Sequence, residues 1–180
     1  AAVIMLLTGE RVETVRIDTP KGIVLDLEPL DVEMTPDYVS CAIRKDSGDD
    51  PDDTNGVLVY ARAERTDGSG IELDGGVGVG RVTKPGLACA VGGPAINPTP
   101  RRMITQEVGK AMETAGYNGG MKLTISIPAG VEIAKITFNP RLGIIGGLSV
   151  LGTSGIVEPL SEKALIEPLY VEIRAQKASG

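Results

Sequence analysis

The stretch of residues 38–65, YVSCAIRKDSGDDPDDTNGVLVYARAER, places an acidic loop between two apolar segments. Residues 38–44 and 57–65 are predicted to be strands, because apolar residues dominate both segments and Gly, Pro and Asp residues bound them. A loop between two strands has both of its ends fixed by the sheet. The acidic block 44–56, RKDSGDDPDDTNG, is therefore expected to be held between two sheet elements.

The sequence on either side of this stretch predicts a hairpin and a helix. Residues 12–18 and 22–27 alternate apolar and polar side chains around a Thr-Pro-Lys-Gly turn, which predicts the hairpin. A helix is predicted over residues 101–115, because Pro100 suits a helix start and Gly116 suits a helix stop. The apolar stripe of this helix is Ile104, Val108, Met112 and Ala115.

Other segments complete the predicted fold. Residues 1–7 are expected to be a helix whose first turns are missing, and residues 121–127 are expected to be a strand. Residues 131–138 fit helix or strand, residues 143–151 fit strand or turn, and Ser161 caps a predicted helix from Glu162 that Pro168 interrupts. The order predicts one α+β domain over residues 1–180, a two-layer α/β sandwich with a mixed or antiparallel sheet and helices on one face.

Composition excludes several classes of protein. The chain of 180 residues carries a net charge of −6, no histidine, two cysteines and 3% aromatic residues. An acidic chain with few rings disfavours nucleic-acid binding, and the lack of histidine excludes Ser-His-Asp and Cys-His catalysis. Cys41 and Cys89 are too few for a disulfide framework and are expected to be small buried residues. No apolar run is long enough to span a bilayer, so a cytoplasmic protein is expected.

Three further Gly/Pro-rich blocks have the composition of ligand-binding loops. They are residues 75–86 (GGVGVGRVTKPG), 92–102 (GGPAINPTPRR) and 137–155 (TFNPRLGIIGGLSVLGTSG). The first does not fit the dinucleotide fingerprint, because Arg81 stands where its third glycine belongs, and a bulged hairpin is favoured there. The acidic block does not fit a calcium loop, because Asn55 replaces the required glycine and Ala61 replaces the bidentate glutamate.

Charge is unevenly distributed along the chain. Residues 26–55 contain ten acidic and two basic residues, whereas residues 81–110 contain five basic residues and one acidic residue. Arg101 and Arg102 follow Thr99 at the predicted helix start, where guanidinium groups and free backbone N–H groups together suit a carboxylate or phosphate. The alternative is an ordinary solvated helix end.

Two Asn-Pro pairs, at Asn97 and Asn139, are each followed by an arginine. Proline favours an extended backbone at the residue before it, so both amides are expected to point into one site or to form structural turns. Asp46, Asp49 and Asp50 in the acidic block are expected to cap turns or to pair with Arg44 and Lys45, with acid–base catalysis as the alternative.

The amino-acid sequences of the blocks resemble those of one protein family. The segments RKDSGDDPDDTNG, GVGVGRVTKPGL, PAINPTPRRMI and SIPAGVEIAKITFNPRLGIIGGLSVLGTSGIVEPLSE are similar to those of the cobalt-precorrin-5B C-methyltransferases of anaerobic cobalamin biosynthesis, the CbiD family. The resemblance covers residues 1 to about 165. It implies methyl transfer from S-adenosylmethionine to ring carbon 1 of cobalt-precorrin-5B, giving cobalt-precorrin-6A, with the cobalt carried by the substrate and not by protein ligands.

The resemblance also implies roles for individual residues. Basic and polar side chains are expected to clamp the carboxylates of the corrinoid, and these are Arg44, Lys45, Thr54, Asn55, Arg81, Lys84, Asn97, Arg101, Arg102, Asn139 and Arg141. The glycine loops are expected to allow close approach of the substrate. Candidate catalytic residues, for proton loss or stabilisation of the sulfonium, are Asp46, Asp49 and Asp50. No donor-binding residue and no metal ligand is identified.

Three departures from the family pattern shape the expectation. A Thr-Thr-Gly-x-Cys segment usual before the first helix is missing, Asn55 stands where family members often have histidine, and a C-terminal donor-binding half does not follow Gly180. The chain is therefore expected to be a substrate-side domain that is truncated at its N-terminus. It is expected to be inactive alone if catalysis needs the C-terminal half. A homo-oligomer is a further expectation. The alternatives are a non-catalytic corrinoid or tetrapyrrole-binding module and a structural domain that binds phosphate ligands.

Overall fold

The fold is built around a five-stranded sheet with the order β3-β4-β5-β9-β6. The computed structural model describes residues 1–48, 50, 52–156, 170, 173 and 177. The strands of the sheet are β3 (Leu30–Met34), β4 (Tyr38–Arg44), β5 (Leu58–Thr66), β6 (Ile71–Gly75) and β9 (Gly120–Ser126). All neighbours are antiparallel except β6 and β9, so the sheet is mixed. Parallel pairing needs a crossover, and the segment between β6 and β9 supplies it.

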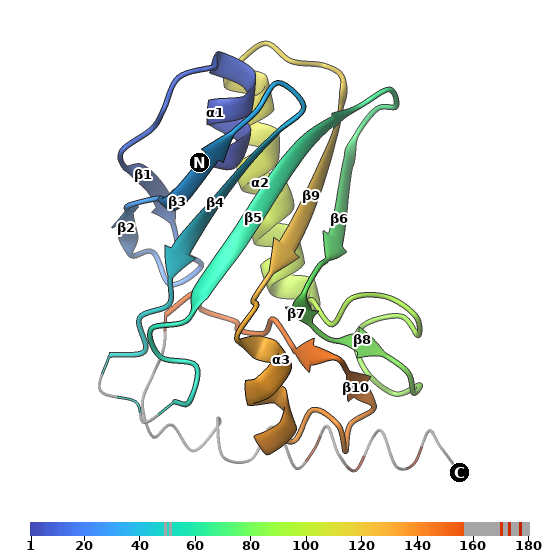
Figure 1. Cartoon of the computed structure of the whole chain (residues 1–180). Coiled ribbons are helices and arrows are strands. Elements are labelled where there is room, and N and C mark those ends of the chain that lie inside the picture. The colour runs from blue at the N-terminus through green and yellow to red at the C-terminus, as the bar shows by residue number, and fades with distance from the viewer. Residues whose placement is uncertain (49, 51, 157–169, 171–172, 174–176, 178–180) are drawn as a thin grey trace.

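Two helices, α1 (Ala2–Thr8) and α2 (Pro98–Thr114), cover one face of the sheet (Figure 1). Their buried side chains meet the inward residues of three strands in one core cluster: Met5, Val108, Met112, Val39, Cys41, Ala63, Met121 and Leu123. The other face carries polar groups, and there the Arg62 guanidinium lies 3.5 Å from the centre of the Tyr38 ring. This arrangement confirms the predicted α+β sandwich with helices on one face.

The predicted hairpin is present as β1 (Val15–Asp18) and β2 (Val24–Leu27), which form a separate two-stranded sheet. Strands β3 and β6 were not predicted. A register shift interrupts the pairing of β3 with β4, and β6 is a short strand between glycine-rich segments, so neither has a long alternating pattern. Residues 131–138 adopt the helical alternative, as α3 (Gly130–Ile133) and the 3-10 turn η1 (Ala134–Ile136). The predicted helix from Glu162 lies outside the described residues.

Helix α2 begins earlier than predicted and ends at Thr114. Pro98, rather than the predicted Pro100, takes the first helical position, where a proline is suited because it has no N–H that would need an acceptor. Ala115 is therefore an exposed C-cap residue and not part of the buried stripe, which correctly included Val108 and Met112. No helix in the part of the chain that the structure describes is long and apolar enough to cross a membrane.

Short strands join the second, third and fourth Gly/Pro-rich blocks below the sheet. Strand β7 (Gly78–Val79) pairs in parallel with β11 (Gly147–Leu148), and β8 (Arg81–Val82) pairs antiparallel with β10 (Ile144–Ile145). Single bridges join Arg81 to Pro94 and Ile96 to Val150. The bulged hairpin predicted for residues 75–86 is therefore wrong, because both of its strands pair with the fourth block instead of with each other.

This joint depends on three glycines whose backbones touch. A Cβ atom on Gly78 would lie 1.7 Å from the Ile127 carbonyl oxygen, and one on Gly130 would lie 2.5 Å from the Gly78 carbonyl oxygen. A Cβ atom on Gly147 would lie 2.3 Å from the carbonyl carbon of Gly78. These neighbours are backbone atoms, so they cannot turn aside as a side chain would. The close approach leaves no room for any other residue.

We predict that Gly147→Ala lowers the free energy of unfolding by about 1–3 kcal/mol or more, because the methyl group overpacks the joint. Gly109→Ala is the matched control: it lies in α2 with nothing within 4 Å of the added methyl group. Alanine there should stabilise the chain by about 0.5–1 kcal/mol through its higher helix propensity. Urea unfolding measures both changes, and a Gly147→Ala chain as stable as the parent would contradict the steric argument.

Candidate functional site

The four Gly/Pro-rich blocks gather at one end of the sheet (Figure 1). Strands β4, β6 and β9 run in the same direction, so their C-terminal ends share this end, where β5 begins. Helix α2 also begins here. Val57, just after the acidic block, packs against the buried cluster that contains Ile96 and Leu148, which ties the first block to the third and fourth. Segments far apart in the sequence therefore form one surface.

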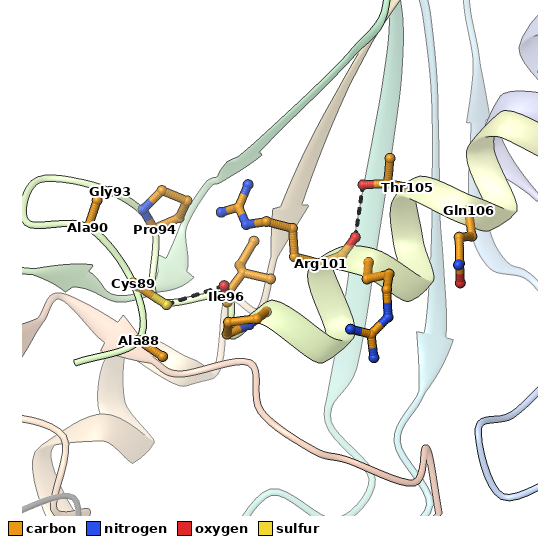
Figure 2. A pocket seen from close by; sticks show the side chains of 11 residues that line it. Ala88, Cys89, Ala90, Gly93, Pro94, Ile96, Arg101, Thr105 and Gln106 are labelled. Atoms are coloured by element: carbon orange, nitrogen blue, oxygen red, sulfur yellow. Dashed lines mark hydrogen bonds between the residues drawn. The ribbon is translucent and has the colours of Figure 1, made fainter.

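A cavity of about 600 Å³ opens on this surface between residues 88–96 and the first two turns of α2 (Figure 2). Its walls are mostly small or apolar, with Ala88, Ala90, Pro94 and Ile96 among them. The charged side chains that line it are Arg101 and Arg102, and none of its lining residues among those described is acidic. An apolar cavity with two guanidinium groups suits a ligand that combines a hydrophobic body with carboxylates.

The two arginines differ in their surroundings. Arg101 Nη1 donates a long hydrogen bond of 3.4 Å to the Leu73 carbonyl oxygen, which holds its side chain toward the end of β6. Arg102 is exposed, and its side chain makes no hydrogen bond or ion pair with the described residues. Arg102 therefore keeps its whole donor set for a ligand, whereas Arg101 shares its own with the fold.

The prediction that several free N–H donors lie at the helix start is wrong. Because α2 begins at Pro98, its first three residues are Pro98, Thr99 and Pro100, and only Thr99 has an N–H. The N–H of Arg101 already donates to the Asn97 carbonyl oxygen at 3.0 Å. Anion binding at this helix start would therefore rest on side chains and not on a row of backbone donors.

Asn97 is the N-cap residue of α2, yet its side chain makes no capping hydrogen bond. The Cys89 thiol donates instead to Asn97 Oδ1 at 3.5 Å and to the Ile96 carbonyl oxygen at 3.3 Å. Burial raises the pKa of the Cys89 thiol, so the group is a neutral donor. Cys89 is half-buried and lines the cavity, whereas Cys41 is fully buried as predicted.

The acidic block is closed by its own hydrogen bonds. Lys45 Nζ pairs with Asp52 Oδ2 at 2.5 Å and donates to Ser47 Oγ at 2.6 Å. The N–H and hydroxyl of Thr54 both donate to Asp52 Oδ1, and the Ser47 N–H donates to Asn55 Oδ1. Three of the predicted substrate-binding residues, Lys45, Thr54 and Asn55, therefore hold the loop together.

Asp52 was missed by the sequence analysis, which expected Lys45 to pair with Asp46, Asp49 or Asp50. An aspartate two residues before a threonine is an Asx-turn pattern that could have indicated its role. Burial by itself raises the pKa of Asp52, but the hydrogen bonds from Lys45 and Thr54 outweigh it and lower the pKa to about 2. Asp46 caps a turn as expected, by accepting from the Gly48 N–H, and Asp49 lies outside the described residues.

The other predicted cations are divided between the fold and the surface. Arg81 pairs with Asp74 at 2.8 Å and donates to the Gly75 carbonyl oxygen, so it fixes the start of the glycine-rich stretch. The hydrogen bond from Arg81 to the Asp74 carboxylate lowers the pKa of Asp74. Arg44 donates to the Gly56 carbonyl oxygen, and the side chain of Lys84 packs over Gly143. Arg141 is exposed and lies 5.6 Å from the centre of the Phe138 ring.

The amides of the two Asn-Pro pairs are also used inside the fold. Asn139 is buried, and its Oδ1 accepts from the Ser149 hydroxyl at 3.2 Å. Asn97 Oδ1 accepts from Cys89, as described above. The structure thus favours the structural-turn alternative over two amide oxygens that face one ligand.

The glycines of residues 75–80 do not form an open cradle. Cβ atoms on Gly75, Gly76, Gly78 and Gly80 would all meet protein atoms within 3 Å. For Gly76 the nearest is the Ser126 hydroxyl oxygen, and for Gly80 it is a methyl carbon of Ile144. On the side where a side chain would stand, the space beside these glycines is therefore filled by the protein itself.

Comparison with known proteins gives consistent matches. A family model described as CbiD matches residues 1–159. Cobalt-precorrin-5B C(1)-methyltransferase of Thermoanaerobacter sp. (strain X514) is 54% identical over 180 residues, covering 100% of this chain and 48% of the relative. The relative of the same name from Ruminiclostridium cellulolyticum is 52% identical over 176 residues, covering 98% of this chain and 46% of the relative. The chain thus spans about half the length of the curated relatives it matches.

One solved structure is similar in fold and sequence. The 1.9 Å crystal structure of cobalamin biosynthesis protein (cbiD) from Archaeoglobus fulgidus matches with a TM-score of 0.65 and 35% identity. The match covers 94% of this chain and 54% of that chain. The similarity supports the α+β arrangement described above.

We predict that Asp52→Asn lowers the free energy of unfolding at pH 7 by about 1–2 kcal/mol, a figure discounted for the partial exposure of the side chain. The pKa of Asp52 is lower in the folded state, about 2, than in the unfolded chain, about 3.9. The stabilisation is therefore complete above about pH 4 and is lost as the pH falls through about 2. Denaturant unfolding across this range measures it.

Asp53→Asn is the matched control, because Asp53 is the exposed neighbour and its carboxylate makes no hydrogen bond or ion pair with the described residues. Its stability should change by less than about 0.5 kcal/mol. Equal losses in the two variants at pH 7 would show that the Lys45–Asp52 pair does not hold the loop.

Proposed function

Since the chain belongs to the CbiD family, we propose that it carries the substrate-binding part of a cobalt-precorrin-5B C(1)-methyltransferase. The proposed reaction moves the methyl group of S-adenosylmethionine to ring carbon 1 of cobalt-precorrin-5B, and it gives cobalt-precorrin-6A in anaerobic cobalamin biosynthesis. The observation that carries the proposal is the apolar cavity with Arg101 and Arg102 at the end of the sheet where the four blocks gather.

The chemistry of the substrate suits this cavity. A corrinoid is a ring with an apolar face and carboxylate side chains around its rim. Arg102 can bind a rim carboxylate with two parallel N–H donors, and Arg101 can contribute the donors that Leu73 does not use. The apolar wall from Ala88 to Ile96 then contacts the hydrophobic part of the ligand. Lys84 and Arg141, exposed on the joined blocks, are candidates for other rim carboxylates.

The methyl transfer is a displacement at carbon. The bond between the methyl carbon and the sulfonium sulfur breaks, and its electron pair stays on sulfur, which becomes a neutral thioether. The electron pair of ring carbon 1 forms the new carbon–carbon bond. The described residues contribute by holding the ring in one orientation and excluding water, which is how position-based catalysis lowers a barrier. Asp46 and Asp50 remain candidate acid–base residues, and a cytoplasmic location and homo-oligomerisation remain predictions.

The glycines of residues 75–80 have protein atoms where their side chains would stand, which supports a role in packing within the fold rather than in binding the methyl donor. The phosphate-binding alternative also loses the support of the helix start, since α2 has a single N–H in its first three residues. A non-catalytic corrinoid-binding module would share the arginine cavity. A turnover assay distinguishes it from the enzyme, because the module would bind the corrinoid without methylating it.

We predict that Arg102→Gln raises the dissociation constant for cobalt-precorrin-5B about tenfold or more, because it removes a charge-assisted bidentate contact. Arg101→Gln should have a smaller effect, since part of that side chain serves the fold. An anaerobic titration followed by absorbance measures both. Arg11→Gln, in the connection between α1 and β1, makes the same charge change away from the cavity and should bind as the parent does.

Unchanged binding in the Arg101→Gln/Arg102→Gln double variant would remove the cavity from the substrate site. Turnover is tested separately, by the S-adenosylmethionine-dependent gain of one methyl group in the pigment when the C-terminal part of a relative is supplied. Pigment binding without this gain would favour the non-catalytic module.

The thiol of Cys89 offers an independent probe of the same cavity. Its raised pKa predicts slow alkylation that accelerates as the pH rises. Bound corrinoid should slow this alkylation severalfold, whereas buried Cys41 should stay unreactive in both states. Mass spectrometry of the two cysteine peptides over time measures the rates, and alkylation of Cys89 at the same rate with saturating pigment would argue against occupancy of the cavity.

A further inference from the structure

A second cavity, of about 260 Å³, lies beside the first between the turn of the β1–β2 hairpin and residues 102–110 of α2. Asp18, Thr19 and Pro20 line it on the hairpin side. The turn is anchored to the fourth block, because the Lys21 N–H donates to the Ser154 carbonyl oxygen and Gly155 packs against Thr19 and Pro20. Thr19 is itself buried and fixed by two hydrogen bonds to Ile23.

The charges of this cavity differ from those of the first. Among the residues that the structure describes, two acidic residues, Asp18 and Glu107, and two basic residues, Arg102 and Lys110, line it. Glu107 and Lys110 neutralise each other in an ion pair of 2.7 Å on the surface of α2. Asp18 and Arg102 remain, and neither side chain makes an ion pair or hydrogen bond with the described residues. The cavity therefore offers one carboxylate and one guanidinium group to a ligand.

An α-amino acid group carries the complementary pair, an ammonium and a carboxylate on one carbon. Its carboxylate suits one edge of the Arg102 guanidinium, whose five donors leave a second edge for the corrinoid carboxylate, and its ammonium suits the carboxylate of Asp18. A volume of about 260 Å³ is below the range of about 300–1,000 Å³ typical of pockets for whole drug-sized ligands. The size thus favours one end of a ligand over a complete one.

We propose that this second cavity binds the amino acid end of the methyl donor. This proposal rests on the proposed methyltransferase function. The two cavities share Arg102 and Gln106, so a ligand in one is adjacent to a ligand in the other across the first turns of α2. The net positive first cavity takes the carboxylated acceptor, and the charge-balanced second cavity takes the zwitterion. Charge alone then directs each reactant to its own side of Arg102.

The test compares two stable probes, S-adenosylhomocysteine and 5′-methylthioadenosine, which differ by the amino acid end. With the 180-residue chain labelled with ¹⁵N, S-adenosylhomocysteine should shift the amide resonances of Thr19, Gln106 and Lys110, and 5′-methylthioadenosine should not. Asp18→Asn should weaken the binding of S-adenosylhomocysteine about tenfold and leave the affinity for the corrinoid unchanged. Asp67→Asn, in the turn between β5 and β6, is the control with the same charge change.

The outcomes separate this inference from the proposed function. If the corrinoid binds but S-adenosylhomocysteine does not bind, shifts other resonances, or binds Asp18→Asn as tightly as the parent, the second cavity is not the donor site. If neither S-adenosylhomocysteine nor the corrinoid binds, the proposed function fails and this inference fails with it. Asp18 is exposed at the end of β1, so its substitution leaves the fold intact and Asp67→Asn reports any general effect of lost charge.

Discussion

The close contact of three backbones at Gly78, Gly130 and Gly147 is the constraint that positions the Gly/Pro-rich blocks at one end of the sheet. It brings the stretch after β6 against the stretch after β9 and against the fourth block, with no side chain between them. Strands β7 and β11 pair at this contact, and β8 pairs with β10 just beyond it. The position of the 88–96 wall follows, because single bridges tie Pro94 to Arg81 in β8 and Ile96 to Val150, two residues after β11.

The charged residues near this contact divide into those that build the loops and those that face outward. Arg81 and Lys45 each have an aspartate beside them and hold a loop in place, whereas Arg102 has no such partner in the described part of the chain. All three residues can be recognised from the sequence as cations in ligand-like loops. Their separate roles cannot, because the difference depends on whether Asp74 or Asp52 lies next to the side chain in the folded chain.

The strands β4, β5 and β9 and the core stripe of α2 could be predicted because each has a regular apolar pattern. Strands β3 and β6 could not, since a register shift disturbs one and glycine-rich segments surround the other. The glycines of residues 75–80 show the same limit at the site. Their composition is equally suited to a ligand or to a neighbouring backbone, and only the arrival of Ile127 and Gly147 from elsewhere in the sequence decides for the backbone.

The strand order β3-β4-β5-β9-β6 has a consequence for the order in which the chain can fold as it is synthesised. Strand β9 lies between β5 and β6, yet it is the last of the five to leave the ribosome. Until it arrives, β5 and β6 cannot join, and β5 presents an unpaired edge next to a growing apolar core. Long-range pairing of this kind is slow and leaves an edge open to other chains in the meantime.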